Sequence, residues 1–233
     1  MHKNFIVVLL GILSITVIIL MISLKNYSTK LDALTKESEK LLLKNEKLAS
    51  TVSYKNMNTT QENEMNYETW GELESIATSF SMDSNGAFKK TWGIYLAKEA
   101  EKHKLDPYLV YELLKVETGG TFDPELVGPE TKYGHAYGMS QFMKNTAPWI
   151  ADMAKLPYHD ELLFDPYYSI KLSVVYLDYL YKQYHNWDES LTAYHRGMAG
   201  MEIYKQTNGS AKSKYAIKIQ TNAKTHRTVA FTN

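Results

Sequence analysis

The sequence of 233 residues contains no cysteine, which excludes disulfides, a thiol nucleophile and a thiolate zinc site. It has no excess of charge either, since 26 basic residues balance 26 acidic ones, so nothing in its charge favours nucleic acid as a partner. Alternating apolar and polar runs, which would predict strands, are lacking as well. Apolar residues instead recur at helical spacing, which predicts an all-α fold. The length suffices for one globular domain with additional segments.

The N-terminus carries an uncharged apolar run from Phe5 to Leu24. As a helix this run would span about 30 Å, the thickness of the hydrocarbon core, so we expect residues 1–25 to form a transmembrane anchor. A cleaved signal peptide is the alternative, but no small-x-small site follows the run and no lipobox cysteine lies in it. The lysines after the run outnumber Lys3, which by the positive-inside rule places the following chain in the cytoplasm; the rule weakens before a long domain.

The next segment, residues 26–53, is predicted to be a short coiled-coil stalk. Leu34, Leu41 and Leu48 recur every seven residues, and Asn45 occupies an alternate core position, where it can fix register and a two-stranded state. The signal covers barely three heptads. A homodimer through this stalk and a single solvated helix therefore both remain open.

The remaining chain divides into three parts by composition. Residues 54–86 read as a polar linker, with one helix expected at 67–80 that can pack on the following domain. Residues 87–205 show helical periodicity and predict a compact helical domain. After Glu202 no acidic side chain follows, so 206–233 is expected to be a basic tail. Such a tail is either a solvated surface or has affinity for anionic wall polymers or lipid headgroups.

Glu117 is the first candidate for chemistry in this domain. It ends an apolar helical run, residues 108–117, and Gly119 and Gly120 follow it in a turn. A carboxyl group among apolar neighbours has a raised pKa and stays neutral, which is the state a general acid requires.

Two further motifs follow Glu117 in the chain: residues 138–141 (GMSQ) and residues 193–197 (AYHRG). With the glutamate they resemble, in order and spacing, the motifs of the goose-lysozyme-like lytic transglycosylases, which cut the glycan strands of peptidoglycan. The resemblance extends from about Trp92 to Tyr204, roughly half of the chain. It implies a lysozyme-like helical domain, and the anchor, stalk and tail lie outside it.

The resemblance also implies a mechanism. Glu117 would protonate the leaving oxygen and then, as a base, deprotonate the sugar's own 6-hydroxyl, which attacks the anomeric carbon and forms a 1,6-anhydro ring. No second catalytic carboxylate is required, and neither a metal nor an organic cofactor is needed. His135, His159 and His195 lack zinc-ligand spacing, so we predict no metal site.

Substrate contacts are expected from residues in and beside the two motifs. They are Gln141, Tyr194, Gly138, Met139, Tyr137 and His195. Gln141 would hydrogen-bond substrate near the acid, and Tyr194 would face Glu117. His195 stands where the family has an asparagine, which puts the role of that asparagine in doubt.

The expected protein is thus a single-pass membrane protein whose catalytic domain faces the cell wall. A hydrolase on the same fold, in which water replaces the 6-hydroxyl, is one rival hypothesis. A non-enzymatic wall-binding module, suggested by His195, is the other. A cytoplasmic domain would contradict all three, because the polymer lies outside the cell.

Overall fold

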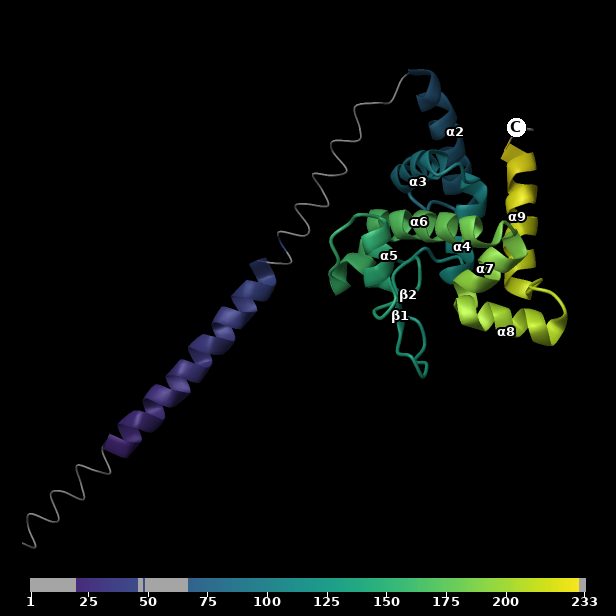
Figure 1. Ribbon diagram of the computed structural model, residues 1–233. Helices are drawn as coiled ribbons and strands as arrows, with labels where there is room; N and C mark the ends of the chain where they lie inside the picture. Colours follow the sequence, from purple (N-terminus) through teal and green to yellow (C-terminus); the bar gives the residue numbers. More distant parts are fainter. Residues whose placement is uncertain (1–19, 46–47, 49–66, 231–233) are drawn as a thin grey trace, which may run out of the picture. The chain divides into compact units, whose positions relative to one another are not determined.

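The computed structural model describes residues 20–45, 48 and 67–230. The chain divides into two compact units, Met1–Ser50 and Thr51–Asn233. Within the first unit, residues 20–45 form one continuous helix (Figure 1).

This first helix carries part of the predicted coiled coil. Leu31, Leu34 and Leu41 lie on it with 65%, 55% and 55% of their surfaces exposed. Pairing of two such helices stays a prediction. The predicted anchor, residues 1–25, lies mostly outside the described residues, and among those that are described no helix is long and apolar enough to cross a membrane.

The described part of the second unit consists of α-helices with one short 3-10 helix and one small antiparallel hairpin (Figure 1). In chain order the elements are α2 (Tyr67–Asp83), α3 (Lys90–Lys102), α4 (Pro107–Glu117), β1 (Ala136–Tyr137), β2 (Phe142–Met143), α5 (Ala147–Met153), η2 (Asp160–Phe164), α6 (Pro166–Tyr184), α7 (Trp187–Arg196), α8 (Met198–Asn208) and α9 (Lys214–Ala230). In the hairpin Ala136 pairs with Met143. The predicted helical character is confirmed.

Two of these helices begin with the same device. Asp106 caps α4 by accepting a hydrogen bond from the backbone amide of Tyr108, and Pro107 occupies the first turn. Asp165 likewise accepts from the amide of Tyr168 at the start of α6. A capping carboxylate satisfies an otherwise unpaired amide, and proline costs nothing where no intrahelical donor is needed. These caps fix where α4 begins and therefore where its last residue, Glu117, lies.

Helix α6 lies at the centre of the second unit and contributes to two hydrophobic clusters. Ile170 and Val174 pack with α2, α3, α4 and α9, whereas Leu172 and Tyr176 pack with α5, η2 and α7. Burying one large apolar side chain contributes about 1.5–3 kcal/mol, so these clusters dominate the stability of the unit.

The folded unit is longer at both ends than the predicted 87–205. Helix α2 crosses α3 so closely that a Cβ atom on Gly93 would lie 2.8 Å from Cα of Ala77. At the other end the expected solvated tail is wrong for most of its length. Helix α9 buries Ala216 and Ile219 against the core, because its small and apolar residues form one continuous face.

Candidate active site

Glu117 is the last residue of α4 and is followed by a tightly held turn. Gly119 and Gly120 have φ values of +61° and +85°, a region that glycine enters without strain. Thr118 fixes the turn, since its hydroxyl donates to the carbonyl of Leu114 and accepts from the amide of Phe122. The backbone at Glu117 is thereby held on both sides.

The carboxyl group of Glu117 is bound by a residue from the far end of the chain. The hydroxyl of Tyr215, in the first turn of α9, donates to Oε1 of Glu117 at 2.5 Å. Burial raises the pKa of Glu117 from 4.5 to about 7, and the Tyr215 hydrogen bond acts in the opposite direction. A buried carboxyl group loses the hydration that stabilises its charged form, so a substantial fraction is neutral near pH 7.

Tyr194 lies beside this pair, as the sequence predicted. Its hydroxyl donates to the carbonyl of Ser140 at 3.1 Å and lies 3.1 Å from Oγ of Ser173. Burial and the charge of Glu117 raise the pKa of Tyr194 well above 10. Tyr194 therefore stays protonated near pH 7, and its hydroxyl group is neutral beside Glu117.

His195 is exposed and stacks on the ring of Tyr215, with centroids 4.6 Å apart and an interplanar angle of 8°. Although part of the ring is exposed, desolvation of the rest, together with the charge of Arg196, lowers the pKa of His195 below its ordinary value of 6.5 and favours the neutral imidazole near pH 7. The histidine thus covers the tyrosine that holds the acid. A direct substrate contact of His195 stays a prediction.

Gln141 braces a loop in this structure. Its side-chain amide donates to the carbonyl of Gly138 at 2.8 Å and to that of Leu126 at 3.4 Å. A Cβ atom on Gly128 would lie 2.6 Å from Oε1 of Gln141, so the amide also fits closely against that glycine. These contacts hold together the base of the loop that follows Glu117. A hydrogen bond from Gln141 to substrate stays a prediction.

Two of the expected substrate contacts are wrong. Met139 has 0% exposed surface and is part of the hydrophobic core, so no glycan can reach it. Gly138 is also buried. The position requires glycine because its φ is +68° and because a Cβ atom there would lie 1.8 Å from the carbonyl oxygen of Leu163. Both residues shape the turn between β1 and β2.

Tyr137 lies on β1 and is partly exposed. Its ring packs edge-on against Phe164 at 5.9 Å, and the ammonium group of Lys144 lies 4.7 Å from the ring centroid. This cation–π contact orients the ring at the surface. Its role as a sugar contact remains untested.

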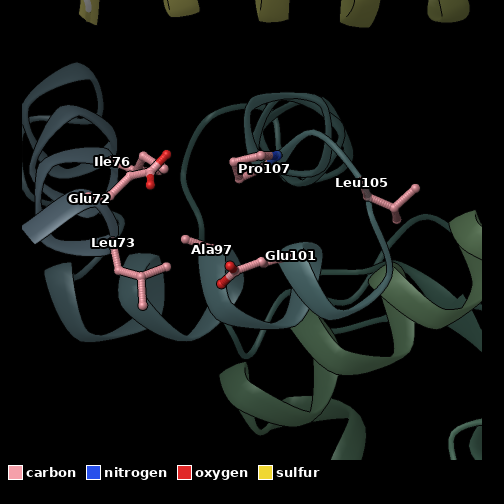
Figure 2. Close-up of a pocket in the computed structure, with 7 residues that line it drawn as sticks. All are labelled: Glu72, Leu73, Ile76, Ala97, Glu101, Leu105 and Pro107. Atoms are coloured by element: carbon pink, nitrogen blue, oxygen red, sulfur yellow. The ribbon is translucent and has the colours of Figure 1, made fainter. Parts of the chain in front are cut away.

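A separate pocket of about 190 Å³ lies between α2, α3 and the start of α4 (Figure 2). It is lined by apolar side chains with Glu72 and Glu101 among them. Pro107, at the opposite end of α4 from Glu117, forms part of its wall. This pocket is therefore distinct from the site around the candidate acid.

One group of the described residues has the composition of a metal site: Asp83, Glu112 and His226, whose ligand atoms lie within 4.8 Å of one another. Nζ of Lys115 lies 2.6 Å from Asp83 and 3.9 Å from Glu112. Because this ammonium group already supplies positive charge to both carboxylates, we assign no metal there.

Sequence reasoning missed Tyr215, which lies in the segment expected to be a tail. One signal could have found it. Tyr215, Ala216, Ile219 and Ala223 follow helical spacing, which predicts a buried face on a helix of that segment.

A glutamic acid with a raised pKa, at a helix end in an α-helical domain, has the properties that acid-catalysed cleavage of glycans requires. Residues 94–217 match the family model described as "Transglycosylase SLT domain". This match covers more than half of the chain, and the protein belongs to that family of lytic transglycosylases. Tyr215 lies within the matched residues, whereas α2 and most of α9 lie outside them.

Among solved structures, the chain is similar to an inactive mutant of the lytic transglycosylase Slt from Pseudomonas aeruginosa. The identity is 18% and the TM-score 0.45, over 56% of this chain and 23% of that one. The chain thus spans less than a quarter of the length of Slt. No curated protein sequence matches it.

Proposed function

We propose that this protein cleaves the β-1,4 bond between N-acetylmuramic acid and N-acetylglucosamine in peptidoglycan and leaves a 1,6-anhydro-muramyl end. The observation that carries the proposal is the pairing of Glu117 with Tyr215 in a site where burial raises the pKa of the acid to about 7. A pKa near the working pH suits one group that must first give a proton and then take one.

The proposed reaction proceeds in two steps at one carboxyl group. In the first, Glu117 gives its proton to the glycosidic oxygen, and the bond to the anomeric carbon breaks with the electron pair leaving on that oxygen. In the second, the carboxylate takes the proton of the 6-hydroxyl, whose oxygen closes on the anomeric carbon. Glu117 ends protonated, the products equal the substrate in mass, and no water is consumed.

The electrostatics of the site support the sugar's own hydroxyl as the nucleophile. Two-carboxylate glycosidases use their second carboxylate as a nucleophile or to activate water. Here burial and Tyr215 account for the shifted pKa of Glu117, and no second carboxylate among the described residues contributes to it. A nucleophile already attached to the reacting sugar, such as its 6-hydroxyl, requires no second carboxylate.

The test is mass spectrometry of purified peptidoglycan digested by the full-length chain and by its Glu117→Gln variant. Release of anhydro-muropeptides by the native protein alone supports the proposal. Products heavier by one water would instead indicate a hydrolase. If both proteins pellet with peptidoglycan and leave it intact, the chain is a wall-binding module.

We further propose that residues 1–25 anchor the protein in the cell membrane and that the second unit faces the cell wall. The length of the apolar run supports the anchor, and the location of peptidoglycan supports the orientation. Proteinase added to intact spheroplasts should degrade the second unit. If it is protected until the cells are lysed, the orientation is wrong.

The exposed leucines of the helix at 20–45 support a homodimer through the stalk. Replacing Leu34 and Leu41 with serine should halve the mass of the detergent-solubilised protein, measured by light scattering. An unchanged mass would exclude pairing through this face.

A further inference from the structure

Helices α4 and α9 lie side by side and run in opposite directions, with polar contacts along their whole length. Glu117 at the end of α4 meets Tyr215 at the start of α9, and Glu112 in the middle meets Asn222. At the other end, Asp106 forms an ion pair with Arg227. The position of Tyr215 on the acid therefore depends on how the rest of α9 is held.

The central contact of this pair involves a buried charge. Glu112 is 2% exposed, and its carboxylate accepts a hydrogen bond from Nδ2 of Asn222 at 3.1 Å. Nδ1 of His226 lies 3.4 Å from the other oxygen of Glu112. Lys115 of the same helix lies 3.9 Å from Glu112, and Asn222 and His226 of α9 supply its further polar contacts. Because a buried carboxyl group that loses such contacts is destabilising, Glu112 favours the position of α9 in which they form.

Helix α2 completes the arrangement from the opposite side. Asp83, its last residue, accepts a hydrogen bond from the hydroxyl of Tyr111 at 2.6 Å and pairs with Lys115 at 2.6 Å. The ring of His226 packs edge-on against Phe80 of α2 and Tyr111 of α4, with centroids 5.7 and 5.3 Å away. Side chains of α2, α4 and α9 thus form one network around Glu112.

Much of this network lies outside the residues that match the family model. The family match ends at residue 217, and Asp83, Asn222 and His226 all lie outside it. Tyr215 lies two turns before Asn222 in one continuous helix, so a displacement at Asn222 is transmitted to the tyrosine. A hydrogen bond of 2.5 Å is lost after a shift of about 1 Å.

We propose that Glu112, Asn222 and His226 are positioning residues for the catalytic acid: they fix α9 against α4 so that the hydroxyl of Tyr215 stays on the carboxyl group of Glu117. The proposal rests on the proposed function, because it assigns a role in that reaction. It predicts that a change far from the substrate alters the titration of the acid as well as the rate.

The groups around Glu117 make this titration a specific readout. Tyr215 of α9 binds the carboxyl group, Tyr194 of α7 lies beside it, and His195 covers Tyr215. Tyr215 is the one whose hydrogen bond lowers the pKa of Glu117. Loss of that bond should therefore move the alkaline limb of the activity profile to higher pH, whereas loss of stability alone should not move it.

The test is a double-mutant cycle in the full-length chain. One variant, called the clamp variant, combines Asn222→Leu with His226→Phe. It removes both polar contacts of α9 to Glu112, while the new phenylalanine ring keeps the aromatic packing of His226. We expect its maximal rate of muropeptide release to fall about tenfold and its alkaline limb to shift upward. In a Tyr215→Phe background the same two substitutions should cost less than about twofold, because the bond they protect is already gone.

The matched control is His103→Phe, which removes a contact of 2.7 Å between His103, the residue after α3, and Asp178 of α6; this contact involves neither α4 nor α9. This substitution should lower the thermal stability of the protein and leave the alkaline limb of its activity profile at the native pH. Equal losses in both backgrounds, or an unmoved limb in the clamp variant, would overturn the proposal. If the clamp variant is unfolded at the assay temperature, Asn222→Leu alone goes through the same cycle.

These outcomes are separate from those for the function itself. Absence of anhydro products from the native protein would refute the proposed function, and their release by Glu117→Gln would refute the role of Glu117 in it. If Glu117 is essential for product release but the two sets of substitutions have additive effects on the rate, the proposed function stands and only the positioning role is refuted.

Discussion

Removing one hydroxyl group, by Tyr215→Phe, should raise the pKa of Glu117. A hydrogen bond to a charged group contributes about 1.5–3 kcal/mol, and about 1.4 kcal/mol corresponds to one pKa unit. The Tyr215 bond opposes the effect of burial, so its loss should move the pKa from about 7 to about 8 or above. The phenylalanine ring keeps the packing against His195, which isolates the effect of the hydroxyl.

The assay is the initial rate of muropeptide release from a peptidoglycan suspension, measured across neutral and alkaline pH. Because the reaction needs protonated Glu117, activity falls as the pH rises through the pKa of this group. At about pH 8 the native protein retains about a tenth of its acid in the protonated form, whereas the variant should retain about half. The maximal rate at low pH should decrease, since the carboxyl group is held less firmly.

The opposite result would refute the reasoning. An alkaline limb that stays in place, or moves to lower pH, would mean that Tyr215 does not stabilise the charged form of Glu117. Thermal unfolding of both proteins at the assay pH controls for a general loss of structure. The Glu117→Gln variant supplies the background rate.

Other predictions concern stability. Glu117 has a folded-state pKa above its ordinary value, so the free energy of unfolding decreases as the pH rises from 4.5 to about 7. Glu117→Gln should therefore be more stable than the native protein at about pH 8, by up to roughly 3 kcal/mol. At about pH 4 it should be no more stable, and urea unfolding measures both differences. Gly138→Ala should unfold the domain or lower its stability by more than about 3 kcal/mol, because the new Cβ would meet the carbonyl of Leu163. Gly134→Ala, at a φ of +99° but in open space, should lower the stability by only about 1–3 kcal/mol in the same unfolding experiment. Gln141→Ala should expose the loop after Glu117 to limited proteolysis, and cleavage as slow as in the native chain would contradict its bracing role.

Local signals in the sequence were enough to predict much of the fold. The Asp-Pro pairs before α4 and α6 act through hydrogen bonds within a few residues, and they locate both helix starts. The end of α4 at Glu117 follows from the glycines after it, and the place of Tyr194 beside the acid follows from the family motif. These features could be predicted because the residues that interact are neighbours in the sequence as well as in the structure.

The role of α9 could not be predicted in the same way. Its buried face consists largely of small residues such as Ala216 and Ala223, which give little hydrophobic signal among the lysines of that segment. The polar contact between Tyr215 of α9 and Glu117 of α4 joins residues 98 positions apart in the sequence. The burial of Met139 is similar, because the turn at the preceding glycine directs the side chain inward and only the folded chain shows it.

The balance at Glu117 explains why a tyrosine is a suitable partner for this acid. Burial alone would raise the pKa of the carboxyl group further and make it a weaker proton donor in the first step. A lysine or arginine at the same place would stabilise the charge so well that no proton would be available to give. The hydroxyl of Tyr215 is neutral and donates one hydrogen bond, and the pKa remains about 7. His195, stacked on that ring and favouring its neutral form near this pH, covers the tyrosine without adding a full charge beside the acid. In the proposed mechanism the same carboxyl group acts in both steps, and this requires a neutral partner, which α9 supplies in Tyr215.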